Sequence, residues 1–111
     1  FVFPSMTETF GLVTLEAMAS ALPVVAYNMA AAATHVRQGI DGFLAEENDE
    51  AGFIQALGDA LAMDLTLAGI DARAQAEDAS WQAVAERFSG LAEVVIRGKS
   101  EYPQVELQSV V

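Results

Sequence analysis

Two carboxylates eight residues apart, Glu8 and Glu16, are the side chains near the start of the chain with the clearest capacity for chemistry. We expect Glu8 in a turn, where it can meet the hydroxyl groups of a ligand, and Glu16 in the early turns of an amphipathic helix. A helix start leaves its first backbone N–H groups without acceptors, and such donors suit a diphosphate. The donors predicted here are the amides of Phe10, Gly11, Leu12 and Val13.

Short apolar segments flank this region on both sides. Residues 1–5 predict a strand that ends at Pro4, and residues 22–27 predict a second strand. A strand, a loop, a helix and a strand in this order form the βαβ unit of a parallel sheet. The expected fold class is therefore α/β, with helices flanking a parallel sheet.

Residues 3–26 resemble a sequence block of the retaining GT-B glycosyltransferases that carry an E-x7-E motif. The block reads P-S-x-x-E-[TS]-F-G-L-x-x-L-E-A-M-A-x-G-x-P-V-[VI]-A, and weaker similarity reaches Leu44 and the region of Trp81. The resemblance implies a partial Rossmann-like domain from the C-terminal, donor-binding half of such an enzyme. It places that domain at residues 1–98, truncated on its N-terminal side, and a C-terminal tail at residues 99–111.

The resemblance also implies roles for the residues of the block. It assigns Glu8 as the catalytic residue, hydrogen-bonded to the transferred sugar, and Glu16 as a ligand of the ribose hydroxyls. It implies retaining transfer of a hexose from a nucleoside diphosphate sugar, with no cofactor and no bound metal ion. The implied substrate-binding residues are Glu8, Phe10, Gly11, Leu12, Val13 and Glu16.

Two positions depart from the family pattern. Ala21 stands where the family has a glycine, so the helix ends there either in a left-handed alanine or with an adapted backbone. Residues 30–34 read Ala-Ala-Ala-Ala-Thr where many members have Gly-Gly-x-x-Glu. Alanines at these positions resemble the GDP-mannose-dependent α-mannosyltransferases, which implies mannose as the sugar.

The composition excludes several function classes. The net charge is −11, and only five basic residues are present, so neither nucleic acid nor an anionic lipid surface is an expected partner. The chain has no cysteine, which removes thiolate chemistry and agrees with a reducing compartment. No apolar stretch is long enough to span a bilayer. We therefore expect a soluble, cytoplasmic protein with no membrane contact in this segment.

The remainder of the chain predicts mostly helix. A short helix is expected to end at Gly39, and a longer one to begin at Asn48 or Asp49, with one apolar side. That side comprises Phe53, Ile54, Leu57, Ala60 and Leu61. A further helix from about Leu65 is expected to break at Gly69, and a last helix to begin at Ser80 and end at Gly98. His35 is expected to be structural, and Trp81 to anchor packing.

Two other functions were weighed against the transferase. A non-catalytic nucleotide-binding or partner-docking module would keep the fold, but it has no reason to retain both Glu8 and Glu16. A flavodoxin-like phosphoacceptor domain would need clustered aspartates at strand ends, which the sequence lacks. The resemblance places the sugar or lipid-linked acceptor on an absent N-terminal half, so the isolated chain is expected to be inactive. Its uncovered sheet edge is expected to drive self-association.

Overall fold

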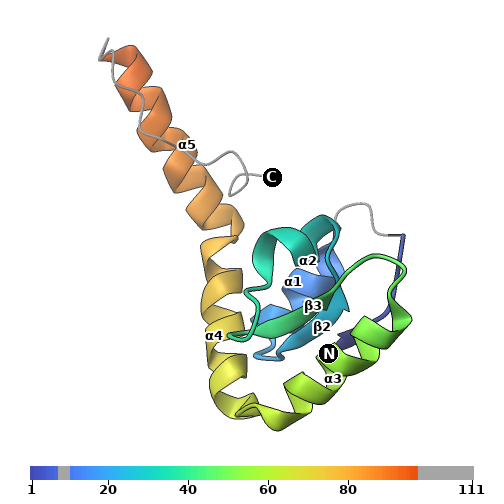
Figure 1. Ribbon diagram of the computed structural model, residues 1–111. Coiled ribbons are helices and arrows are strands. Elements are labelled where there is room, and N and C mark those ends of the chain that lie inside the picture. The colour runs from blue at the N-terminus through green and yellow to red at the C-terminus, as the bar shows by residue number, and fades with distance from the viewer. Residues whose placement is uncertain (8–10, 98–111) are drawn as a thin grey trace. The chain divides into compact units, whose positions relative to one another are not determined.

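A computed structural model of the chain describes residues 1–7 and 11–97. The chain divides into two compact units, Phe1–Ala76 and Glu77–Val111, which are described separately. The elements in chain order are β1 (Val2–Phe3), α1 (Leu12–Ala19), β2 (Val24–Tyr27), α2 (Ala30–His35), β3 (Gly42–Ala45), α3 (Glu50–Ala62), α4 (Leu65–Asp78) and α5 (Trp81–Ile96) (Figure 1).

The first unit is built on a parallel sheet with the strand order β1-β2-β3. Val25 of β2 lies between Val2 of β1 and Phe43 of β3. All four residues of β2 are buried, as expected for a central parallel strand that is covered on both faces. The predicted α/β class, with a parallel sheet and flanking helices, is confirmed.

The side chains of β2 alternate between two packed faces. One is the alanine face, where Val24 and Ala26 pack against α1, α2 and α4; its buried members are Ala17, Met18, Val24, Ala26, Ala32, Val36, Ala72 and Ala76. The other is the aromatic face, where α3 packs on the sheet; its buried members are Val25, Tyr27 and Ala45 of the sheet and Phe53, Ala56 and Ala60 of α3. The rings of Tyr27 and Phe53 lie 4.8 Å apart between their centroids. The sheet is therefore enclosed by small side chains on one side and by aromatic bulk on the other.

The end of α1 is closed by a left-handed alanine. Ala21 has a φ of 59°, and its N–H donates to the Met18 carbonyl while that of Leu22 donates to the Ala17 carbonyl. These two bonds form a Schellman motif, which glycine usually completes. Of the two helix ends that the sequence left open at position 21, the structure has the left-handed one.

Gly69 does not break α4, contrary to the sequence prediction, because it serves a close contact. A Cβ added to Gly69 would lie 2.2 Å from the carbonyl oxygen of Ala21. The helix runs without interruption from Leu65 to Asp78. Glycine is required here by the approach of another backbone rather than by a turn.

Two further helix predictions need correction. The helix α2 ends at His35, and Gly39, with a φ of 76°, lies instead in the turn before β3. On α3, Ile54 and Leu61 are exposed, whereas Phe53, Ala56 and Ala60 are buried. The predicted apolar side is therefore wrong for Ile54 and Leu61 and right for Phe53 and Ala60, while Leu57 is partly buried against the same cluster. The predicted cap is correct, since Asp49 accepts a hydrogen bond from the Gly52 N–H at 2.8 Å.

The corner between α3 and α4 is sharp. The axes bend by 108° at the break between the two helices. Asp64 begins α4 by accepting hydrogen bonds from the Thr66 and Leu67 N–H groups at 3.0 and 3.1 Å. No single helix within residues 11–97 has the length and hydropathy to cross a membrane, and α3 and α4 reach that measure only when they are taken together.

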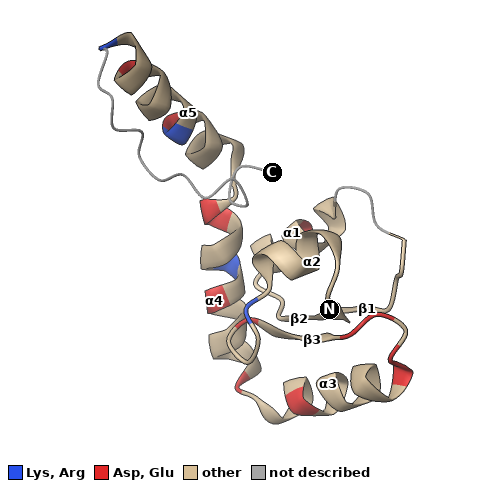
Figure 2. Cartoon of the chain, turned by 45° about the horizontal axis from the view of Figure 1, so that its top comes forward, with Lys and Arg blue, Asp and Glu red and all other residues tan. Residues whose placement is uncertain are grey.

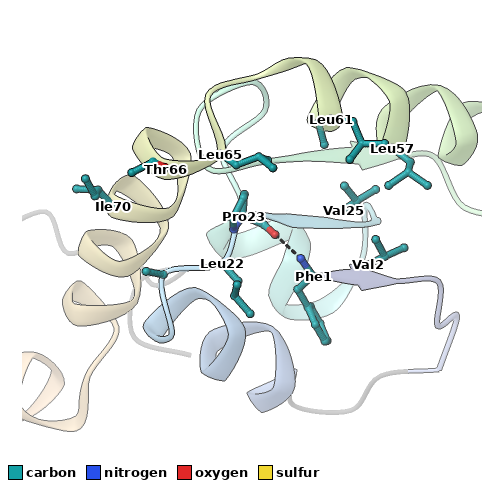
Figure 3. Close-up of a pocket in the computed structure, with 12 residues that line it drawn as sticks. Phe1, Val2, Leu22, Pro23, Val25, Leu57, Leu61, Leu65, Thr66 and Ile70 are labelled. Carbon is teal, nitrogen blue, oxygen red and sulfur yellow. Dashed lines mark hydrogen bonds between the residues drawn. The ribbon is translucent and has the colours of Figure 1, made fainter.

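An open apolar groove lies beside this corner, at the amino ends of β1 and β2. It has a volume of about 520 Å³ and carries no charged side chain, although acidic residues are spread along α3 and α4 (Figures 2 and 3). The N-terminal ammonium of Phe1 donates to the Pro23 carbonyl at 2.7 Å at its edge. The residues that line the groove include Val2, Leu22, Leu57, Leu61, Leu65 and Ile70. Self-association of the isolated chain through an uncovered sheet edge stays a prediction, which light scattering at increasing concentration tests.

The second unit contains α5, which begins as predicted. The Ser80 hydroxyl accepts a hydrogen bond from the Ala83 N–H at 3.2 Å. Trp81 is 87% exposed, so the prediction that it anchors packing is wrong for this chain. The predicted helix end at Gly98 and the predicted tail at residues 99–111 lie outside the described residues.

Candidate functional site

The candidate site lies where the chain leaves the carboxyl end of β1 and enters α1. In open parallel sheets, ligands bind outside the carboxyl ends of the strands. Gly11 precedes α1 with a φ of 66°, and its carbonyl oxygen accepts the Thr14 and Leu15 N–H groups at 3.1 and 3.4 Å. The N–H groups of Leu12 and Val13 therefore have no acceptor within the helix. The side chains of both residues are exposed, which places the helix start at the surface.

Glu16 lies one turn further along the same exposed stripe of α1. It follows Leu12 by four residues and Val13 by three, which are the spacings of helix neighbours. The Cα–Cβ bonds of a helix tilt toward its N-terminus, so the side chain of Glu16 leaves the backbone on the side of the turn that carries Leu12 and Val13. The side chain is exposed to solvent. Its neighbours Ala17 and Met18 are buried on the other side of α1.

The structure brings together four of the six predicted substrate-binding residues: Gly11, Leu12, Val13 and Glu16. The other two, Glu8 and Phe10, lie outside the described residues, so their positions relative to Glu16 are not given. The sequence block is continuous through this region. Gly11 therefore belongs both to the sequence motif and to the described start of α1, where it is the N-cap residue.

The residues beneath the start of α1 are closely packed and leave only a very small cavity. Thr14 is 1% exposed, and the cavity that it lines with Phe3, Ser5 and Tyr27 has a volume of about 10 Å³. Such a space holds about one water molecule and no larger ligand. A larger ligand at this point would have to lie outside the helix start.

A half-buried ion pair just before the amino end of β3 was not anticipated from the sequence. Asp41 is fully buried, and its carboxylate accepts hydrogen bonds from the backbone N–H and the Nε of Arg37 at 2.6 and 2.7 Å. The Arg37 side chain also donates to the Asp71 carbonyl of α4 at 3.3 Å. This pair joins the segment between α2 and β3 to α4. The spacing of an arginine and an aspartate four residues apart is the signal that could have revealed it.

His35 is buried on α2, in agreement with its predicted structural place. Burial disfavours the imidazolium and lowers the pKa of His35 from its ordinary value. Within residues 1–7 and 11–97, no three side chains of the types His, Cys, Asp or Glu are grouped so that they could hold a metal ion. His35 therefore belongs to the alanine-face helices and not to a ligand cluster.

Comparison with known proteins identifies the family. A family model described as glycosyl transferases group 1 matches residues 1–63, the part of the chain that holds the sheet and the start of α1. The chain belongs to this family. The predicted relationship to glycosyltransferases is confirmed at this level.

Curated relatives carry the name D-inositol 3-phosphate glycosyltransferase. Those of Streptomyces scabiei and Geodermatophilus obscurus are 42% and 44% identical to this chain over 82 residues, which are 72% and 73% of the chain and 18% of each relative. The relative from Corynebacterium efficiens is 38% identical over 90 residues, or 79% of the chain and 21% of the relative. The chain thus spans about a fifth of the length of these relatives. No solved structure matches it.

Proposed function

We propose that this chain is the nucleotide-sugar-binding part of a retaining glycosyltransferase, which transfers a hexose to a sugar or lipid-linked acceptor. The supporting observation is the start of α1, where free amides and an exposed carboxylate share one surface at the carboxyl end of a parallel strand. This start lies within the residues that match the group 1 family. The complete enzyme supplies the acceptor site from the rest of its length.

Catalysis at this site is mainly electrostatic. Negative charge grows on the diphosphate as the bond to the sugar breaks, and fixed donors lower the energy of that charge. The Leu12 and Val13 N–H groups are such donors, since Gly11 holds them at the first turn of α1. The transfer needs no resident metal ion and no cofactor under this proposal.

The two glutamates have different roles. A carboxylate repels phosphate but accepts hydrogen bonds from hydroxyl groups. Glu16, one turn behind the amides, therefore binds the ribose hydroxyls of the nucleotide, which lie beyond the diphosphate. Glu8, which follows β1 in the sequence, binds hydroxyls of the transferred sugar and is the catalytic residue.

The proposed donor is GDP-mannose, on the ground of the alanines at positions 30–33. The relatives are named for D-inositol 3-phosphate, so that compound is one acceptor to be tested beside simple sugars and lipid-linked sugars. A chain without cysteine suits a reducing compartment, and we place the reaction in the cytoplasm.

Titration of the complete protein with GDP, GDP-mannose and other nucleoside diphosphates tests the binding role. Glu16→Gln is expected to weaken binding about tenfold, because a hydrogen bond to a charged group contributes about 1.5–3 kcal/mol. Asp59→Asn is the matched control, an exposed carboxylate on α3 at the opposite face of the sheet. Equal affinities for all three proteins would remove Glu16 from the site.

Steady-state kinetics of the complete enzyme separate the roles of the two carboxylates. Glu8→Gln should lower kcat with little change in KM for the donor, whereas Glu16→Gln should raise KM. Nucleotide binding without any detectable transfer by the complete protein would support the non-catalytic module instead. The isolated chain is expected to bind nucleotide weakly and to transfer no sugar.

A further inference from the structure

The candidate site is held from the side by one close contact between two helix starts. A Cβ added to Gly11 would lie 2.0 Å from the Cβ of Ala31 and 3.1 Å from its Cα and N atoms. Two carbon atoms without a bond between them do not approach to 2.0 Å, so only one methyl group fits between positions 11 and 31. The structure places that methyl on Ala31, which is 8% exposed, and leaves position 11 bare.

The position of Ala31 is itself fixed from below. Its neighbour Ala32 is part of the alanine face, packed with Ala26 of β2 and Met18 of α1. Ala30 begins α2 with a left-handed φ of 49°, which directs the chain sharply out of the segment that follows β2. The first turn of α2 is therefore anchored to the sheet, and Gly11 rests on it.

This contact bears on the donors of the site, because the Gly11 carbonyl caps α1 and its backbone leads into the free amides of Leu12 and Val13. A shift of Gly11 away from α2 moves those amides with it. We propose that Ala31 is a positioning residue for the diphosphate, whose methyl sets how far the start of α1 stands from the start of α2. The assignment rests on the proposed function, since it takes the α1 start as the diphosphate site.

A double-mutant cycle in the complete glycosyltransferase tests the assignment, with GDP binding and donor kcat/KM as readouts. Gly11→Ala places a second methyl in the contact and displaces the helix start. We expect kcat/KM to fall by about 100-fold, the effect of misplacing a reacting group by about 1 Å. Ala31→Gly empties the contact and should cost only a few-fold in GDP affinity.

The double variant Gly11→Ala with Ala31→Gly exchanges the two methyl-bearing positions. It should recover most of the loss of Gly11→Ala, to within about tenfold of the parent, because the contact again holds one methyl. Full recovery is not expected, since alanine at position 11 keeps a left-handed φ of 66°. Ala33→Gly is the matched control, an exposed position of the same helix with the same loss of helix propensity and no contact with Gly11.

Melting curves of all variants separate a displaced site from a damaged fold. A double variant that binds GDP no better than Gly11→Ala, while both stay folded, overturns the assignment. Unchanged GDP affinity in Gly11→Ala also overturns it. If Gly11→Ala does not fold, Ala31→Val tests the same contact by adding bulk at position 31. An unaltered GDP affinity in Ala31→Val would also overturn the assignment. A parent protein that binds no nucleoside diphosphate overturns the proposed function itself. If the substitutions change only the melting temperature, and neither GDP affinity nor kcat/KM, the contact serves packing alone and the positioning role is overturned.

Discussion

The two faces of the sheet are packed by different means. On the aromatic face, α3 fills the space over β2 with the rings of Phe53 and Tyr27. On the alanine face, α1, α2 and α4 pack against each other and against the sheet through alanines. Gly11 and Gly69 lie so close to Ala31 and Ala21 that a Cβ at either glycine would clash. Bulk contributes stability, whereas close approach fixes where one backbone lies against another. The candidate site lies at the start of α1, one of the helices that cover the alanine face.

The largest effect expected from this comparison is on the aromatic face. Phe53→Ala removes a buried ring and should lower the free energy of unfolding by about 3–5 kcal/mol. Denaturant unfolding measures the loss, and Ile54→Ala, next to it but 70% exposed, should change stability by less than about 0.5 kcal/mol. Among molecules that remain folded, nucleotide affinity should be unchanged. A specific loss of affinity in Phe53→Ala would contradict the separation of the two faces.

The same substitution at two helical glycines should have opposite signs. Gly69→Ala on α4 brings a methyl to 2.2 Å from the Ala21 carbonyl oxygen and should cost about 1–3 kcal/mol through overpacking. Gly58→Ala on α3 meets open space and should add up to about 1 kcal/mol by helix propensity. Thermal melts of both variants beside the parent measure the difference. A gain in stability for Gly69→Ala would show that the contact is looser than the geometry requires.

A smaller gain is expected at the other side of that contact. Ala21→Gly relieves a non-glycine residue at a φ of 59° and should stabilise the protein by about 1 kcal/mol. The removed methyl would lie 3.7 Å from a Cβ added to Gly69, an ordinary van der Waals distance, so it is not tightly packed against that residue. Chemical denaturation gives the change in unfolding free energy. A loss of stability would mean that this methyl matters more to packing than the strain that it causes.

The smallest effect concerns pH. The pKa of His35 is lowered by burial in the folded state, whereas the unfolded chain keeps a value of about 6.5. The unfolded state then binds more protons below that pH, so the free energy of unfolding should fall as the pH drops through 6.5 toward the folded pKa. Stability measured at several pH values between 7.5 and 5.5 checks this slope. His35→Asn should flatten it, and an unchanged slope in that variant would assign the effect to other groups.

The local features of the fold were open to prediction from the sequence, because each depends on residues within a few positions. The caps at Asp49 and Ser80 follow from a side chain that meets an N–H three residues ahead. The end of α1 near Ala21 follows from the Pro-Val-Val strand just beyond it, but the sequence left the conformation of Ala21 open. The order of strands and helices along the chain also follows from local sequence, since apolar strand segments flank an amphipathic helical segment. The exposure of Ile54 was missed because its environment depends on a sheet that the local pattern does not contain.

By itself, the sequence determined the βαβ start of the chain, the position of α1 and the family to which the chain belongs, since the motif is continuous along the polypeptide. Only the tertiary structure decided how that start is held. Gly11 meets Ala31, Gly69 meets Ala21, and Arg37 reaches Asp71, each across a stretch that no local pattern links. The physical reason is steric: whether a position tolerates a methyl depends on the atom opposite, and that atom comes from a distant part of the chain.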